Sequence, residues 1–186
     1  MEARRPALRA RLPRAIEADP ELAARVARAL ADARPLWSGG EIPVARAPLT
    51  SALVAVLRRA QRAGELVRGL EGAERALEAE ERGLRLAAQR SAGPHGARVS
   101  RLLLLADDGA ERFYRRAESL LRRHAPRLLA VRLAADEAAL GESLFGPGRA
   151  ARAVLLERKE AVVGALAALA GASDARPPGG DPARRA

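Results

Sequence analysis

An α/β fold is predicted for this chain by two observations. Three short apolar runs, at residues 102–105, 128–131 and 153–156, are each bounded by charged or turn residues. Continuous apolar runs of this length are typical of strands that are covered on both faces. A segment with helical periodicity follows each run, so strands and helices alternate from about residue 66 onwards. The sequence therefore predicts a three-layer α/β/α sandwich with a small mixed sheet.

The first part of the chain predicts an N-terminal helical extension over residues 1–48. Asp19 is a suitable N-cap and Pro20 suits a first helical turn, which predicts one helix over about residues 19–33. The Arg-rich residues 1–18 are expected to be poorly ordered. Prolines and glycines within residues 35–48 predict a linker. The folded domain is then expected over 49–172, and the Pro/Gly-rich residues 173–186 are expected to form a disordered tail.

The first half of the expected domain contains two helices around a short strand. Thr50 or Ser51 can cap a helix whose apolar face includes Leu53 and Leu57, and Gly64 ends it. Residues 65–67 are a strand candidate, and a helix is expected from about 71 to 82. Residues 90–98 read as a loop.

The second half continues the alternation. Residues 99–106 and 127–133 are expected to be core strands, with a helix between them that runs to His124. Asp108 is the expected N-cap of that helix, and Glu111 three residues later resembles a capping box. A helix is expected over 136–144, a third core strand over 153–156, and a last helix over 159–170.

The chain is strongly basic and its cations are almost all arginines. The formal net charge is +10, and only Lys159 among the 33 basic residues is a lysine. Arginine offers a planar fork that suits phosphate, and phosphate neutralisation supplies most non-specific affinity for nucleic acids. A GC-rich codon pool would also favour arginine and alanine, so the composition alone leaves both origins open. The cations are spread along the whole chain, which favours a basic surface on a folded domain over a basic arm.

Other classes of function find little support. The chain has no cysteine and two histidines, which disfavours disulfides and zinc sites. We expect no signal peptide and no contact with a membrane, because the longest apolar stretch, 161–172, is shorter than the roughly 20 residues of a bilayer span. A cytoplasmic location is the default expectation.

Catalytic chemistry is also disfavoured. Asp107 and Asp108 follow a predicted strand and could hold Mg²⁺, but helix capping explains them better. No phosphate-binding loop, dinucleotide fingerprint or nucleophile elbow occurs. We therefore expect a protein that is not an enzyme, with no catalytic residues, metal or cofactor. A metal-dependent enzyme at Asp107 and Asp108 stays open as a minor alternative.

Two basic features are candidate binding surfaces. Arg68 and Gly69 precede a predicted helix that begins near Glu71 and carries Arg75. A helix N-terminus offers unpaired N–H groups and partial positive charge, which suit a phosphate. The helix before His124 carries a stripe of arginines that could track a phosphate backbone. An ordinary turn and a solvated helix face are the alternatives. The secondary basic surface comprises Arg58, Arg62, Arg112, Arg116 and Arg123.

Three segments together resemble a known family. They are LVAVLRRAQRAGELVRGLEGAERALEAE, then LLLLADDG at 102–109, then DEAALGESLFG at 136–146. In this order they resemble the bacterial YlxQ-type members of the ribosomal L-seven-Ae superfamily, which bind kink-turn RNA. The resemblance covers roughly residues 49–172. Residues 1–48 resemble at most the end of a YlxR-type domain, to which some such proteins are fused, and the Cys- and GRG-containing core of that domain is missing.

The resemblance implies an α/β/α sandwich that binds structured RNA, with ribosomal RNA, the ribosome or translation factors as partners. It places the RNA face on the following positions: Arg68, Gly69, Glu71, Arg75, Gly146, Gly148 and Arg149. Kink-turn readers carry Asn-Glu after the glycine, whereas this chain has Glu71-Gly72. Glutamate lacks the amide donors of asparagine and repels phosphate, which argues against strict kink-turn reading. A protein-interaction module on the same fold is the alternative function.

Overall fold

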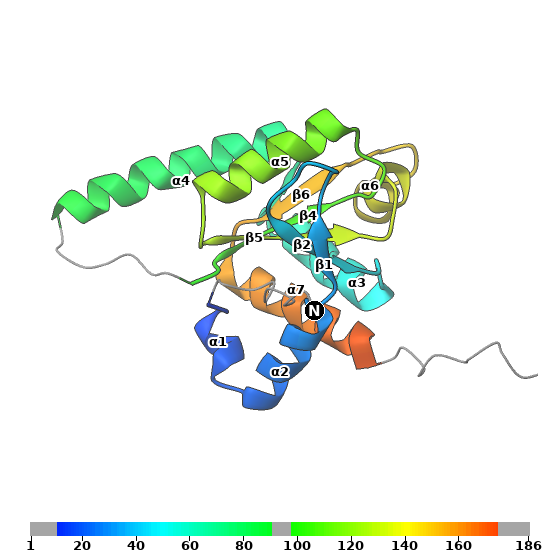
Figure 1. The fold of residues 1–186 in the computed structure, drawn as a ribbon, viewed down its shortest axis with the longest axis horizontal. Helices are drawn as coiled ribbons and strands as arrows, with labels where there is room; N and C mark the ends of the chain where they lie inside the picture. Colours follow the sequence, from blue (N-terminus) through cyan, green and yellow to red (C-terminus); the bar gives the residue numbers. More distant parts are fainter. Residues whose placement is uncertain (1–10, 91–97, 175–186) are drawn as a thin grey trace, which may run out of the picture.

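A computed structural model describes residues 11–90 and 98–174 and shows an α/β sandwich around one mixed sheet (Figure 1). The six strands lie in the order β1-β2-β5-β4-β6-β3. β4 pairs in parallel with β5 and β5 with β2, whereas β6 is antiparallel to both β4 and β3, and β1 is antiparallel to β2. The strands are β1 (Ala33–Pro35), β2 (Pro43–Ala47), β3 (Leu66–Arg68), β4 (Arg101–Leu105), β5 (Leu128–Leu133) and β6 (Ala153–Leu156).

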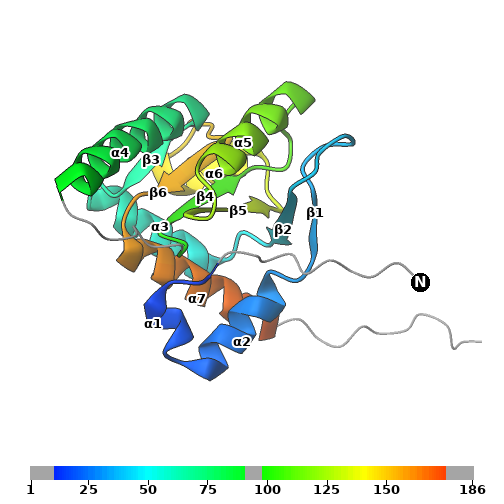
Figure 2. The same ribbon diagram turned by 60° about the vertical axis from the view of Figure 1, so that its left-hand side comes forward.

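Helices cover both faces of this sheet, as the sequence predicts. In Figure 2, α4 and α5 lie on one face and α3 and α7 on the other, with α1 and α2 packed below α7. The described helices are α1 (Arg14–Glu17), α2 (Pro20–Ala29), α3 (Ser51–Arg62), α4 (Leu70–Arg90), α5 (Glu111–Arg123), α6 (Glu137–Phe145) and α7 (Lys159–Asp174). The three-layer prediction is confirmed.

The central strand β4 explains why two helical layers are needed. Its four consecutive leucines are all 0% exposed. Leu102 and Leu104 belong to the core on the α7 side, and Leu103 and Leu105 to the core on the α4 and α5 side. Successive side chains of a strand point to opposite faces, so an unbroken apolar run requires apolar cover on both.

Local capping chemistry begins several helices where the sequence predicts. Thr50 accepts a hydrogen bond from the Leu53 amide at 3.2 Å at the start of α3. Asp19 accepts from two amides at 3.1 Å at the start of α2. Asp136 does the same for the Ala139 amide at 2.7 Å. These side chains satisfy backbone donors that the first turn of a helix leaves free.

The capping role predicted for Asp108 is wrong. The N-cap of α5 is Ala110, which gives no side-chain cap. Asp108 instead accepts a hydrogen bond from the Glu137 amide at 3.1 Å, so it serves α6. The Tyr114 hydroxyl accepts a hydrogen bond from the Gly109 amide at 3.0 Å and donates one to the Ala106 carbonyl at 2.9 Å. This contact holds the chain in a wider turn that moves the start of α5 to Glu111.

The N-terminal part differs most from the prediction. The expected linker at 35–48 contains β2, and together with β1 it forms a hairpin that extends the sheet past β5. The helix predicted over 19–33 ends at Ala29, because the chain turns into β1 at Ala33. Val26 and Leu30 are buried in the same core as α7. Part of the segment 1–18 expected to be poorly ordered forms α1, and residues 1–10 lie outside the described residues.

Two further helix ends move. α4 continues to Arg90, beyond the expected end near 82, and α7 to Asp174, beyond 170. Gly83 lies inside α4, where glycine is tolerated at a modest cost. Residues 91–97 of the predicted loop, and residues 175–186 of the predicted tail, lie outside the described part of the chain.

A buried carboxylate fastens the hairpin loop to α5. Glu118 is 4% exposed. It accepts hydrogen bonds from the Trp37 indole at 2.7 Å, the Glu41 amide at 2.8 Å, the Ile42 amide at 3.3 Å and the Arg122 guanidinium at 2.9 Å. Burial by itself would raise the pKa of Glu118, but these donors outweigh it and hold the pKa below its ordinary value of 4.5.

We expect Glu118→Gln to lower the free energy of unfolding by about 2 kcal/mol near neutral pH, because an amide cannot accept all of these bonds. The folded-state pKa is depressed, so the contribution of Glu118 is complete above pH 4.5 and is lost as the pH falls through the folded value. Urea unfolding across the acid range should therefore show wild type and variant converging.

The matched control is Glu78→Gln, which removes an exposed ion pair with Arg123 of 3.0 Å. Such a pair contributes at most about 1 kcal/mol. Equal losses for both variants, or a Glu118→Gln loss that persists at acid pH, would contradict the anchoring role.

Candidate nucleic-acid interface

The turn between β3 and α4 is formed by Arg68 and Gly69. Gly69 has φ +81°, a left-handed conformation that favours glycine. Its amide donates to the Ala153 carbonyl at 2.8 Å, which ties the turn to the start of β6. Its carbonyl accepts from the Ala73 amide at 3.0 Å and begins the hydrogen-bond ladder of α4. The residue at the N-cap position thus has no side chain to cap the helix.

Three amides in the first turn of α4 have no acceptor. Among the described residues, no side chain or carbonyl accepts a hydrogen bond from the amides of residues 70–72. Free amides at a helix start favour an anion, since the helix dipole adds partial positive charge there.

The loop between α6 and β6 lies against this turn. Gly146 and Gly148 have φ +92° and +69°, so both sharp bends of the loop require glycine. The Arg149 amide donates to the Gly146 carbonyl at 3.2 Å. The Gly148 amide donates to the Glu142 side chain at 3.1 Å, and so this donor is already occupied.

Arg68 joins the two segments. Its guanidinium donates a hydrogen bond to the Ala150 carbonyl and lies 5.0 Å from the centre of the Phe145 ring. The structure therefore brings the turn at 68–69 and the loop at 146–150 together, as the expected RNA face requires. We call these two segments, with the first turn of α4 and Arg75, the corner.

The corner keeps free positive charge. Arg75 and Arg149 are exposed, and neither has an ion pair with another residue in the described ranges. Glu71 is the exception among the expected site residues, because its carboxylate lies 3.5 Å from Arg116 of α5. Its negative charge is thus directed towards α5.

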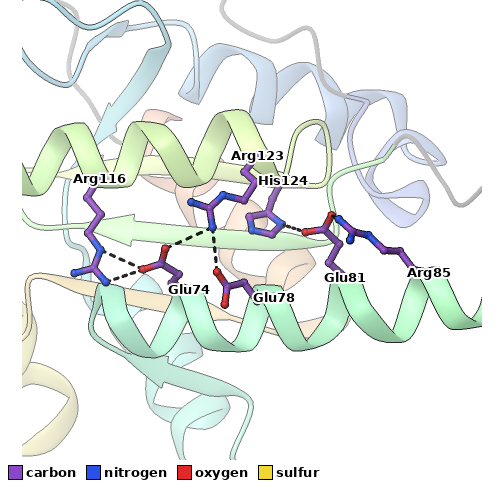
Figure 3. A network of polar contacts seen from close by, with 7 residues as sticks. All are labelled: Glu74, Glu78, Glu81, Arg85, Arg116, Arg123 and His124. Carbon is purple, nitrogen blue, oxygen red and sulfur yellow. Dashed lines mark hydrogen bonds and ion pairs between the residues drawn. The ribbon is translucent and has the colours of Figure 1, made fainter.

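The arginine stripe of α5 is largely engaged by glutamates of α4 (Figure 3). Arg116 contacts Glu74 at 2.6 Å. Arg123 contacts Glu74 and Glu78 at 3.5 and 3.0 Å. Because glutamates of α4 neutralise these arginines, the face formed by α4 and α5 carries much less unpaired positive charge than the arginine stripe of α5 alone suggests.

The other members of the secondary basic surface are divided. Arg58 donates to the Ser143 carbonyl at 2.6 Å, which links α3 to α6. Arg62 and Arg112 are exposed and have no partner within the described chain. The structure does not gather these residues into one surface, since they lie on α3 and α5, on opposite faces of the sheet (Figure 1).

His124 follows the stripe and is mostly buried, with 8% of its side chain exposed. Burial lowers its pKa below the ordinary 6.5, although the charge of Glu81, 3.8 Å away, acts in the opposite direction. Its Nε2 has no hydrogen-bond partner among residues 11–90 and 98–174. The side chain is neutral at physiological pH and packs between the end of α5 and α4.

Of the two carboxylates that follow β4, Asp107 faces an arginine and Asp108 accepts the Glu137 amide. Asp107 lies 3.9 Å from Arg46, and its carbonyl accepts a hydrogen bond from Arg132 at 2.7 Å. In the ranges that the structure describes, no group of three acidic or histidine side chains could hold a metal ion. No described helix has both the length and the apolar character to cross a bilayer.

Two residues that shape the corner escaped the sequence reasoning. Gly141 lies in α6, where an added Cβ would stand 1.8 Å from the Arg149 carbonyl oxygen. Phe145 forms the surface beneath Arg68. A glycine inside a helical pattern is a signal of close approach, and it could have drawn attention to Gly141.

Comparisons with known proteins give no family. No protein-family model and no curated protein matches the chain. Several solved structures match, among them one titled "The structure of a protein with unknown function from Bacillus halodurans C", with 18% identity and a TM-score of 0.42. The match covers 66% of this chain and 99% of that one. A likeness this weak carries no argument about function.

We expect Gly141→Ala to destabilise the fold by about 2 kcal/mol or more, because the new methyl group would force the loop at 149–150 away from α6. Chemical denaturation would measure the loss. In the control, Gly83→Ala, the methyl group meets open space inside α4. That change should stabilise by about 0.5–1 kcal/mol. A neutral result for Gly141→Ala would mean that the loop is not held against α6.

Proposed function

We propose that this protein binds structured RNA, with ribosomal RNA as the first candidate, and acts in the cytoplasm without catalysing a reaction. The observation that supports the proposal best is the corner. It combines an uncapped helix N-terminus, the bridging Arg68 and the exposed Arg75 and Arg149, from two segments that are far apart in the sequence and that the Arg68–Ala150 contact joins. Such a site suits a phosphate backbone.

The resemblance to the YlxQ-type proteins supports the same surface, because it places the RNA face on these two segments. Glu71-Gly72 differs from the Asn-Glu pair of kink-turn readers. The Glu71 carboxylate also lies next to Arg116, so it leaves the free amides at the start of α4 available as donors. We therefore propose that affinity comes mainly from phosphate contacts and shape, and that strict kink-turn reading is absent.

The alternative of a protein-interaction module has less support. Such a module could dock a partner through its N-terminal helix, but α2 buries Val26 and Leu30 in the same core as α7, so its apolar face is already covered. Nothing else in the described chain favours a particular protein partner over RNA.

Filter binding to ribosomal RNA at two salt concentrations tests the proposal. If the corner neutralises three phosphates, the affinity should fall by about 40-fold between about 50 and 200 mM salt, because binding releases counterions. Binding that is absent, or that does not change with salt, would overturn the proposal.

The double variant Arg75→Gln/Arg149→Gln should weaken RNA binding by about tenfold or more, since both side chains are free for phosphate. The matched control, Arg116→Gln/Arg123→Gln, removes the same charge from side chains engaged by glutamates and should change affinity by only about twofold. The reverse order would place the RNA on the α5 stripe.

A further inference from the structure

A second basic site lies at the other end of the sheet. A pocket of about 450 Å³ opens between α1, the middle of α4, the start of β4 and the start of α7. Pro13, Leu84 and Val99 give it apolar walls. The corner adjoins Ala153, where β6 begins, whereas this pocket adjoins Lys159, just beyond Leu156, where β6 ends. One ligand of modest size cannot touch both sites.

Among the residues that the structure describes, every titratable side chain that lines the pocket is cationic. These side chains are Arg14, Arg98, Arg127 and Lys159. Pockets of this volume are typical of small-molecule ligands, and a lining with one sign of charge selects the opposite sign. The pocket therefore suits a compact anion.

Two of the four cations are held in place by acids outside the lining. Arg98 bonds Glu17 and donates to the Leu12 carbonyl at 3.1 Å. Arg127 bonds Glu80, which also contacts Arg101 at 2.6 Å. Each acid is shared by two arginines, since Arg11 also lies 3.7 Å from Glu17. Positive charge thus exceeds negative charge at both anchors.

The remaining two cations are free. Arg14 and Lys159 are exposed and have no partner among the residues described. Lys159 also occupies the first position of a sixteen-residue helix, where the helix dipole disfavours a cation. Glu160 offsets this in part, but it does not line the pocket. An anion held there would relieve the repulsion.

Arg101, beside Arg127, has a lowered pKa whose largest cause is burial. Burial lowers the pKa of this side chain, Glu80 raises it, and the charge of the neighbouring Arg127 lowers it again, with a net decrease. An anion near Arg127 would oppose that decrease.

We propose that this pocket binds a phosphate group, carried either by a small phosphorylated molecule or by the 5′ end of an RNA. Arg98 and Arg127 would form its preorganised base, because their acids fix the guanidinium groups in place. Arg14 and Lys159 would close over the phosphate from α1 and α7. The proposal does not depend on RNA binding at the corner.

Isothermal titration of the full chain with inorganic pyrophosphate tests the site. We expect saturable binding of one equivalent, weakened about tenfold or more in Arg14→Gln/Lys159→Gln, because each lost charge removes a direct phosphate contact. The matched control is Arg59→Gln/Arg112→Gln, which removes two exposed, unpaired cations outside the pocket and should leave affinity unchanged. Neither double variant removes a contact within the described fold, so thermal unfolding should show no loss of stability, and Lys159→Gln should raise it slightly because the helix dipole disfavours a cation there.

A second arm identifies the source of the phosphate. A short RNA with a 5′-phosphate is compared with the same RNA ending in a 5′-hydroxyl. A preference for the phosphorylated RNA that disappears in Arg14→Gln/Lys159→Gln assigns the pocket to an RNA end. Pyrophosphate binding without that preference assigns it to a small phosphorylated molecule. No saturable pyrophosphate binding, or equal weakening in both double variants, overturns the proposal, whatever the corner variants do.

Discussion

The burial of β4 on both faces is the constraint on which the molecule depends. Because four consecutive leucines make both faces of the strand apolar, each face must be shielded from water by its own layer of helices. The helices of these layers connect one strand to the next, so the loops between helices and strands lie at the two ends of the sheet. Both basic sites lie at those ends. The corner forms where β3 and β6 meet at one end, and the pocket forms beneath α4 at the other.

Many of the charged side chains are organised into pairs between neighbouring elements. Glu74 and Glu78 of α4 engage arginines of α5. Glu80 of α4, together with Glu17, holds arginines around the pocket. What remains uncompensated are single exposed cations such as Arg75, Arg149, Arg14 and Lys159. A net charge of +10 is therefore less informative than where the cations without an acidic partner in the described chain gather beside free amides or a pocket.

Much of the fold could be predicted because its signals are local. The leucine run at 102–105 identified a doubly covered strand, and Asp19, Thr50 and Asp136 marked helix starts through bonds to amides two or three residues away. The hairpin could not be predicted in the same way. Its prolines and glycines resemble a linker, and its anchor is Glu118, 76 to 81 residues away.

The candidate site shows the same division. Gly69, Gly146 and Gly148 could be selected from sequence because each bend needs a left-handed residue. Glu74 bonds Arg116, which lies 42 residues later in the sequence. This contact depends on how α4 and α5 pack, so neither segment alone predicts it. The contact between Arg68 and Ala150 likewise exists only because β3 and β6 are neighbours.

The two outer strands have a consequence for how copies of this protein meet. β1 and β3 are each three residues long, Pro35 of β1 has no amide hydrogen to offer, and β3 ends in the charged Arg68. Short, interrupted and charged borders are poor templates for a strand from another molecule. A sheet whose interior strands consist mostly of leucine, valine and alanine is thereby protected from edge-to-edge aggregation.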